Sequence, residues 1–295
     1  MILDRRYETF LTLAKTASYT KTAQQLFITQ PAVTQQIASL QKDLQIELVK
    51  YERPKLIITP AGQELAKFIE SVTIKSHQIL AHLKQPNDKR PLKFGATLSF
   101  NAIVEPQFIK QISDQFTDIN CLVANTDQIL SQIDNGEIEF GLVEGNFQLA
   151  DYDFIPIFKD DFIAVCNSKN PLAKKKAVQL TDCLQWPLLL RERGSGTRSI
   201  LENWLGTMNR SVTDFSKVIT VGDMTTIIGL LESNLGISFM YRSLLPQQLA
   251  NGQLIQLPLA DFKITRTLSM VFQRQSYYEA QYRQMANIIK RLLGQ

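Results

Sequence analysis

Residues 22–41 read TAQQLFITQPAVTQQIASLQ, and none of these twenty residues carries a charge. Across the whole chain 20% of the residues are Asp, Glu, Lys or Arg, so an uncharged window of this length is unusual. Thr29 is a good N-cap, and Pro31 is tolerated in a first helical turn because its missing N–H has no intrahelical partner there. The window therefore predicts a helix from Gln30 to about Asp43.

The predicted helix has two different faces. Val33, Ile37 and Leu40 converge at helical spacing and predict a buried face. The opposite face has small residues, amides and a hydroxyl but almost no charge, and it comprises Gln30, Pro31, Thr34, Gln35, Ala38 and Lys42. Groups that both donate and accept hydrogen bonds suit base edges in a major groove. Taken alone, the same pattern also fits a polar, solvent-facing helix of an ordinary α-helical bundle.

Short elements are predicted on both sides of this helix. Apolar spacing predicts a helix over 4–16, and Ser18 or Thr20 begins a second helix that ends near Leu26. After the third helix, LVKY (48–51) and KLII (55–58) are separated by Arg53-Pro54, which is typical of a small hairpin or wing. Thr59 and Pro60 then begin a helix to about Lys84, whose length suits a dimerising rod.

The surplus of basic residues lies in the same third of the chain. The net charge is +3 over residues 1–62, +2 over 63–90 and −1 over the remainder. Phosphate contacts need positive charge, whereas base contacts carry the sequence information. We expect phosphate contacts from Lys21, Lys42, Lys50, Arg53 and Lys55.

The order of these elements is that of a known family. The stretch FLTLAKTASYTKTAQQLFITQPAVTQQIASLQKDLQIELVKYERPKLIITPAG (10–62) resembles the N-terminal domain of LysR-type transcriptional regulators, with TQPAVT in place of SQPAVS and ITPAG in place of LTPAG. The resemblance implies a winged helix-turn-helix over 1–59, a linker and dimerisation helix over 60–88 and an effector domain of periplasmic-binding-protein type over 89–295. It assigns DNA reading to Gln30, Pro31, Thr34 and Gln35.

The chain departs from the family pattern at four positions. Gln41 stands where the family usually has Glu, and Gln45 stands where it usually has Gly. Val49 and Tyr51 replace the Phe and Arg of LF-x-R. The missing Arg removes a contact to the DNA backbone, which Lys50 or Arg53 could replace.

The C-terminal two-thirds alternate between strand and helix patterns. This rhythm predicts an α/β fold with a mostly parallel sheet and helices on both faces. The resemblance implies two subdomains, residues 91–161 with 267–295 and residues 162–266, with a ligand cleft between them.

Ligands in open α/β sheets gather at the carboxyl ends of strands and at helix N-termini. Three segments fit this rule: ATLSFN (96–101), VEGN (143–146) and the Gly-Ser-Gly turn of LLLRERGSGTR (188–198). Hydroxyls in the first and last of these also fit simple helix caps and a tight turn. The resemblance favours binding, because family members often bind small and commonly anionic effectors here. The expected effector-binding residues are Thr97, Ser99, Asn101, Glu144, Gly194, Ser195, Thr197 and Arg198.

Several other kinds of site are not expected. Cys121, Cys166 and Cys183 are widely spaced in apolar contexts, which favours buried free thiols. His77 and His82 share no helix face, so neither a metal site nor a cofactor is predicted. The sequence contains no apolar run long enough to cross a membrane and no signal-peptide pattern, so we expect a cytoplasmic protein.

Three functions were compared. A transport receptor of periplasmic type is disfavoured because there is no signal peptide. An enzyme with GSGTR as a phosphate cradle is disfavoured because GxxxxGK[ST] is absent and both histidines lie in the predicted linker helix. A DNA-binding regulator that responds to a small effector fits best, with no catalytic residues. The resemblance implies a homodimer or a dimer of dimers, RNA polymerase as a partner, and an interrupted palindrome in double-stranded DNA.

Overall fold

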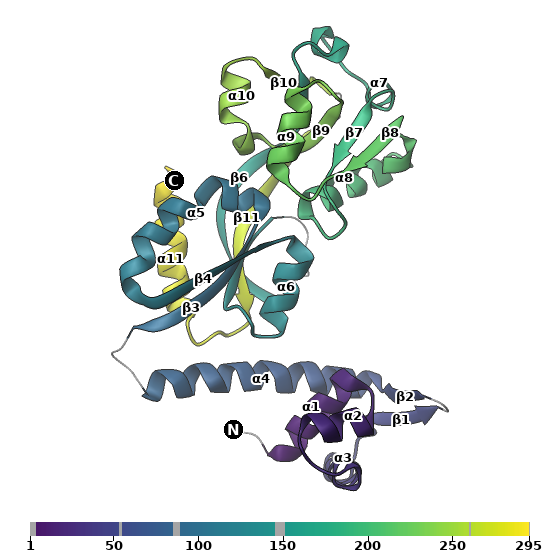
Figure 1. Ribbon diagram of the computed structural model, residues 1–295, viewed down its shortest axis with the longest axis vertical. Helices are drawn as coiled ribbons and strands as arrows, with labels where there is room; N and C mark the ends of the chain where they lie inside the picture. The colour runs from purple at the N-terminus through teal and green to yellow at the C-terminus, as the bar shows by residue number, and fades with distance from the viewer. Residues whose placement is uncertain (1–3, 53–54, 85–88, 145–150, 260, 295) are drawn as a thin grey trace. The chain divides into compact units, whose positions relative to one another are not determined.

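The computed structural model describes residues 4–52, 55–84, 89–144, 151–259 and 261–294. The chain forms two compact units, Met1–Asp88 and Lys89–Gln295, which we call unit 1 and unit 2 (Figure 1). No helix among the described residues is long and apolar enough to span a membrane.

Unit 1 contains the elements expected of a winged helix-turn-helix. Asp4, Ser18 and Thr29 cap the first three helices, each accepting a hydrogen bond from a backbone N–H two or three residues further on. The helices are α1 (Arg5–Thr16), α2 (Tyr19–Gln25), α3 (Gln30–Leu44) and the long α4 (Pro60–Lys84), and the hairpin strands are β1 (Val49–Glu52) and β2 (Lys55–Ile58). The predicted fold class is confirmed in this unit.

One apolar core joins these elements. Phe10 and Leu13 of α1 pack against the buried face of α3, and Ile69 places α4 in the same cluster. Gln41 takes the position of the family's usual Glu, and its Oε1 accepts hydrogen bonds from the backbone N–H of Leu48 at 2.7 Å and of Val49 at 3.1 Å. The neutral amide of Gln41 therefore holds the start of the hairpin through these hydrogen bonds, where a glutamate would carry a charge.

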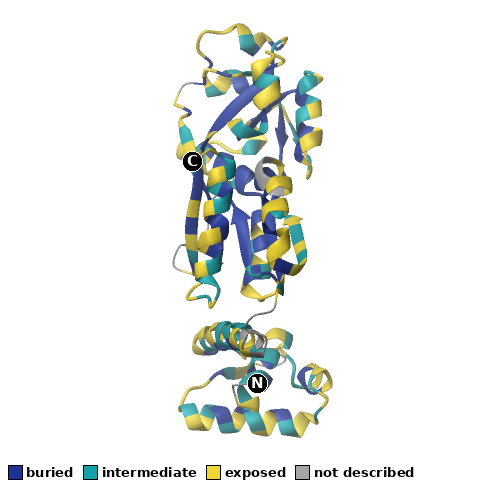
Figure 2. Cartoon of the chain, turned by 90° about the vertical axis from the view of Figure 1, so that its left-hand side faces the viewer, coloured by how far each residue is buried: buried dark blue, intermediate teal, exposed yellow. Residues whose placement is uncertain are grey.

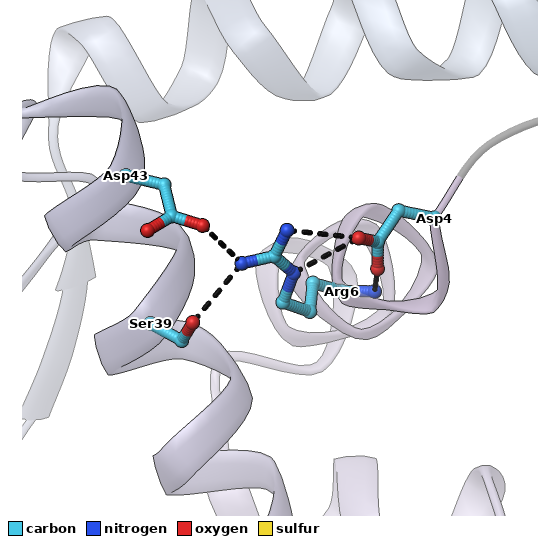
Figure 3. A network of polar contacts seen from close by, with 4 residues as sticks. All are labelled: Asp4, Arg6, Ser39 and Asp43. Carbon is cyan, nitrogen blue, oxygen red and sulfur yellow. Dashed lines mark hydrogen bonds and ion pairs between the residues drawn. The ribbon is translucent and has the colours of Figure 1, made fainter.

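A polar network links the start of α1 to the end of α3 (Figure 3). Arg6 Nη1 donates to Ser39 Oγ at 3.0 Å and pairs with Asp43, while Nε and Nη2 donate to the Asp4 carboxylate at 3.1 and 2.8 Å. The hydrogen bonds to Asp4 and Asp43 raise the pKa of Arg6. Together with the apolar core, this network orients α3 relative to α1.

Unit 2 is an α/β structure of two halves. The first half contains β3 (Arg90–Thr97), α5 (Leu98–Ile112), β4 (Phe116–Ala124), α6 (Thr126–Asp134), β5 (Phe140–Val143) and α11 (Glu279–Leu292). The second half contains α7 (Leu180–Cys183), β7 (Pro187–Leu190), α8 (Gly196–Thr207), β8 (Lys217–Thr220), α9 (Met224–Glu232), β9 (Ile237–Tyr241), α10 (Pro246–Ala250) and β10 (Leu254–Gln256). Two long strands, β6 (Tyr152–Asn167) and β11 (Ile264–Gln273), run through both halves (Figure 1).

The sheet is mixed, so the expectation of a mostly parallel sheet was wrong. Its strand order is β4-β3-β5-β11-β6-β9-β7-β8, with β10 beside β6. The pairs of β3 with β4 and β5 and of β7 with β8 and β9 are parallel, whereas every pair that involves β6 or β11 is antiparallel. The reason is that β6 carries the chain from the first half to the second and β11 carries it back.

The helices of the first half cover the two faces of its sheet. Phe94 and Phe140 point to the face that α5 and α11 cover, where they stack on each other and Phe140 contacts Tyr282. On the other face, Ile129 and Ile133 of α6 pack over the sheet next to Gly141. Figure 2 shows the strands of unit 2 as mostly buried. The carboxyl ends of β3, β4 and β5 therefore emerge between the start of α5 and the start of α6.

Candidate nucleic-acid interface and candidate effector site

The exposed face of α3 matches the face that the helical wheel predicted. Val33, Ile37 and Leu40 are at most 1% exposed. The residues on the other side are exposed to solvent: Gln30, Pro31, Thr34, Gln35, Ala38 and Lys42. We call Gln30, Pro31, Thr34 and Gln35 the reading face. Its exposure is established here, and its contact with DNA stays a prediction.

Hydrogen bonds distinguish the glutamines of α3. Gln36 Oε1 accepts from Thr9 Oγ1 at 2.6 Å and so belongs to the packing against α1. Gln30 Oε1 accepts from Thr20 Oγ1 at 3.3 Å, which orients its amide from α2. Among the described residues the Gln35 side chain has no hydrogen-bond partner, so its donor and acceptor both face solvent.

Positive charge borders the reading face. Lys21, Lys42 and Lys55 are exposed, and within the described part of the chain none of them forms an ion pair. Lys50 lies 3.3 Å from Glu47, and both side chains are more than half exposed. Arg53 lies outside the described residues.

Phe27 is a feature of this surface that the sequence did not single out. Its side chain is 95% exposed and lies in the turn before α3. Its φ of 55° is in the left-handed region, which costs energy for residues other than glycine and asparagine. An apolar ring exposed three residues before Gln30 extends the surface available to a ligand of α3.

The second candidate site begins at the end of β3 and β5 in unit 2. Thr97 caps α5 and donates its hydroxyl hydrogen to the carboxylate of Glu144, which is 2% exposed. Burial raises the pKa of Glu144, and the Thr97 and Ser99 hydroxyls and the Arg191 charge offset this only in part. Thr97, Ser99 and Glu144, which were predicted separately, therefore lie together.

The Gly-Ser-Gly turn crosses from the second half of unit 2 to the first. The carbonyl of Gly194 accepts a hydrogen bond from Asp127 N–H at the start of α6, at 3.3 Å. A Cβ at Gly196 would lie 2.6 Å from the carbonyl oxygen of Glu144, so only glycine fits this approach. The turn therefore lies against the backbone carbonyl of Glu144.

The polar side chains of this turn form hydrogen bonds with one another and with neighbouring residues. Ser195 Oγ and Thr197 Oγ1 lie 2.8 Å apart and share a hydrogen bond. Arg198 donates from Nε to Glu202 at 2.8 Å and from Nη1 to the carbonyl of Arg191 at 3.1 Å. The charge expected to hold an anion is thus already paired within α8. Contacts of these residues with an effector stay a prediction.

Three residues that the sequence did not indicate complete the site. Tyr241 at the end of β9 is 0% exposed, and burial together with the charges of Glu144 and Asp160 raises its pKa well above the usual value. The register pairs Phe162 with Tyr241 and with Ile264, and pairs Asp160 with Arg266. Tyr241, Asp160 and Arg266 therefore share one face of the sheet. Because they come from three strands, no local pattern could have found them.

Among the described residues, the cysteines and histidines do not gather at one place. Cys166 and Cys183 are buried free thiols, and burial raises the pKa of each to about 12. Cys121 is half-buried. His77 is exposed, and the side chain of His82 lies outside the described residues. Within the described residues, no group of at least three His, Cys, Asp or Glu side chains could hold a metal ion.

Known proteins resemble both units. Residues 5–63 match the family model described as "Bacterial regulatory helix-turn-helix protein, lysR family", and residues 86–294 match "LysR substrate binding domain". The transcriptional activator CmpR of Synechocystis is 27% identical over 274 residues, covering 91% of this chain and 88% of CmpR.

Solved structures share the fold. ArgP from Mycobacterium tuberculosis superposes with a TM-score of 0.68 at 15% identity, over 98% of each chain. The Synechocystis CcmR regulatory domain in complex with 2-PG superposes with a TM-score of 0.60 at 19% identity, over 68% of this chain and 98% of that domain.

Proposed function

Because the chain belongs to the LysR family of bacterial helix-turn-helix regulators, we propose that unit 1 reads double-stranded DNA through α3 while unit 2 binds a small effector that modulates this reading. Proteins of this family are transcriptional regulators with a DNA-binding and an effector-binding domain. The observation that carries the first half of the proposal is the exposed, uncharged reading face behind which Val33, Ile37 and Leu40 are buried.

The side chains of the reading face match the chemistry of base edges. The free amide of Gln35 can donate and accept at once, as bidentate pairing with adenine requires. Pro31 and the methyl group of Thr34 can contact a thymine methyl. Lys21, Lys42, Lys50 and Lys55, with Arg53, supply phosphate contacts, which position the protein and make binding sensitive to salt.

The second half of the proposal rests on the polar groups at the carboxyl ends of the strands of unit 2. The effector is a small molecule with an anionic group, which the N-terminus of α5 and the nearby Arg266 favour. CcmR, with 2-PG bound to its regulatory domain, shows that a domain of this fold accepts a small molecule. An effector changes the arrangement of the two halves only if it binds two arrangements unequally.

Oligomers and partners follow from the same proposal. Phe68 of α4 is 65% exposed, as is Leu83, and a second copy of α4 would cover such apolar side chains. We propose a homodimer through α4, or a dimer of dimers, that binds an interrupted palindrome. RNA polymerase is the proposed downstream partner, the cytoplasm the proposed location, and neither a cofactor nor catalysis is involved.

A mobility-shift assay across genomic fragments, followed by footprinting, tests the DNA-reading role. Some fragments should bind selectively, and Gln35→Ala should weaken their binding about 10- to 100-fold, the value of one bidentate base contact. Thr34→Arg should also abolish or redirect selectivity, because it places a bulky charge on the reading face. Gln284→Ala removes an exposed helical glutamine of unit 2 and serves as the matched control. If both α3 variants keep the selectivity of the native protein, the proposal is wrong.

A further inference from the structure

Several buried polar atoms of unit 2 lack a hydrogen bond, and three of them lie around Glu144. Among the described residues, Tyr241 Oη and Arg266 Nε are buried without a partner, and so is Asn101 Oδ1 in the first turns of α5. Ser99 Oγ makes no close hydrogen bond either, although it lies near enough to the Glu144 carboxylate to lower its pKa. Ser99 and Tyr241 are both 0% exposed. Buried polar groups are nearly always paired in folded proteins, because an unpaired one destabilises the fold. A concentration of them in one place marks a spot where a bound molecule, a ligand or water, can pair with them.

The fold brings Ser99, Tyr241 and Arg266 to one side of the sheet, and Asn101 follows two residues after Ser99 in α5. The α5 face of the first half carries Glu144, two positions beyond Leu142 on β5, and the first turn of α5 adds Ser99. Phe100 of α5 contacts the ring of Phe158 on β6, two residues before Asp160, so the same face continues along β6. The charges of Glu144, Asp160 and Arg266 all act on the Tyr241 hydroxyl. We call Ser99, Asn101, Glu144, Tyr241 and Arg266 the polar cluster.

The cluster offers donors on one side and acceptors on the other. Arg266 Nε–H can only donate, and the hydroxyls of Tyr241 and Ser99 can donate as well. These three groups suit a carboxylate. Asn101 Oδ1 can only accept. The Glu144 carboxylate can accept about four hydrogen bonds, so it keeps acceptor capacity beyond the Thr97 and Ser99 hydroxyls. These two acceptors suit an N–H or O–H group of a ligand.

A plain anion satisfies only half of this arrangement. It would leave the acceptors unpaired, and it would face a like charge wherever Glu144 is ionised. The other cations nearby do not compensate, because Arg191 donates to Glu192 at 2.8 and 2.9 Å and Arg198 pairs with Glu202 at 2.8 Å. Asp160, which accepts from Ser243, adds a further negative charge on the face of Arg266.

We propose that the polar cluster binds a small carboxylic acid that also carries an amino or hydroxyl donor, the chemistry of an amino acid or a hydroxy acid. This inference rests on the proposed function, since it names the class of effector that unit 2 takes. The carboxylate lies against Arg266, Tyr241 and Ser99, and the donor lies against Glu144 and Asn101.

Matched acids test the ligand class on the full-length protein by thermal shift. Each set of three probes differs only in the donor: alanine, lactate and propionate; aspartate, malate and succinate; glutamate, 2-hydroxyglutarate and glutarate. In at least one set, the amino or hydroxy acid should raise the Tm with a midpoint concentration at least tenfold below that of the plain acid. Whichever of the amino acid and the hydroxy acid has the lower midpoint identifies the donor group of the ligand. Inorganic phosphate serves as the plain anion.

A pair of tyrosine variants tests the location. Tyr241→Phe deletes an unpartnered hydroxyl, so it should leave the Tm without ligand unchanged or higher and weaken the active probe at least tenfold. Tyr282→Phe is the matched control, since the buried Tyr282 hydroxyl donates to Glu139 at 3.1 Å. It should lower the Tm and leave the midpoint of the probe unchanged. Ser99→Ala should also weaken the active probe.

Three results overturn the inference: equal shifts by the plain acid or phosphate, no shift by any probe, or an unchanged midpoint in Tyr241→Phe. Selective DNA binding in the mobility-shift assay is scored separately. If it persists while every probe fails, only the ligand class is wrong. If it is absent while a probe binds, the proposed regulator function is wrong and the binding site stands.

Discussion

The reading face of α3 and the polar cluster of unit 2 are both polar surfaces, but they differ in their relation to water. The side chains of the reading face are exposed, so water satisfies their hydrogen bonds when no DNA is present. Several atoms of the polar cluster are buried and have no protein partner, so only a bound molecule can pair with them. A partner of the reading face must therefore displace bulk water, whereas a ligand of the cluster pairs with atoms that the protein itself leaves unpaired.

The two surfaces also differ in how they are built. The reading face comes from residues 30–35 of a single helix, and its geometry follows from 3.6 residues per turn. The polar cluster takes residues from α5, from the end of β5, and from β9 and β11. Changing a side chain should therefore affect unit 1 and unit 2 in different ways. Three variants test this difference, and they follow from the largest expected effect to the smallest.

Ile37→Ala tests whether the buried face holds the reading face in place. Ile37 is 1% exposed in the core of unit 1. Truncation of a buried isoleucine to alanine costs about 2–5 kcal/mol through lost apolar contact and the cavity that it leaves. Hydrogen exchange of the α3 amides, measured by mass spectrometry on the full chain, should accelerate accordingly.

Tryptophan fluorescence supplies the control for this variant. Both tryptophans, Trp186 and Trp204, lie in unit 2, so the unfolding followed by their fluorescence should not change. Protected α3 amides in Ile37→Ala would contradict the packing described here.

Glu144→Gln tests whether the polar cluster contains a buried carboxyl group with a raised pKa. Burial raises the pKa of Glu144 in the folded protein above its ordinary value of 4.5. Between that value and the raised pKa, the folded state holds the proton more tightly than the unfolded state. The contribution of Glu144 to stability is therefore fully present below pH 4.5 and is lost as the pH rises through the folded pKa.

Glutamine keeps the shape and an acceptor for Thr97 but cannot ionise. The Tm of Glu144→Gln should therefore rise relative to the Tm of the native protein as the pH rises from about 4.5 to 8. Tryptophan fluorescence follows the unfolding of unit 2 in both proteins. A difference in Tm that stays constant with pH would show that Glu144 is not a buried carboxyl with a raised pKa.

Gln45→Gly should give the smallest change. Gln45 ends α3 with φ 57°, where a Cβ is unfavourable and the family usually has glycine. Glycine should stabilise unit 1 by about 1 kcal/mol, because the left-handed conformation costs about that much for other residues. Hydrogen exchange of α3 should slow, and DNA affinity should stay unchanged because Gln45 lies outside the reading face.

Gln24→Gly is the matched control for this substitution. Gln24 is exposed inside α2, where glycine should destabilise the helix by about 1 kcal/mol. A loss of stability in both variants would mean that the conformation of Gln45 imposes no strain.

The sequence by itself determined the local features of this protein. Helical spacing placed Val33, Ile37 and Leu40 on one side of α3, and Thr29 with Pro31 marked its start. Composition in the same way indicated the hairpin and the long α4. These features depend on neighbours within about four residues along the chain, where the geometry of the backbone is known in advance.

Only the tertiary structure decided the rest. The antiparallel pairing of β6 and β11 joins residues about a hundred positions apart, as Asp160 and Arg266 show. The sequence also pointed to Arg198 as an anion-binding residue, but folding pairs it with Glu202. Tyr241 belongs to the polar cluster because packing buries it where the charge of Glu144 acts on its hydroxyl. Burial and partners belong to the folded chain, so a pattern of residue types can name candidates for a site but cannot say which of them remain unpaired.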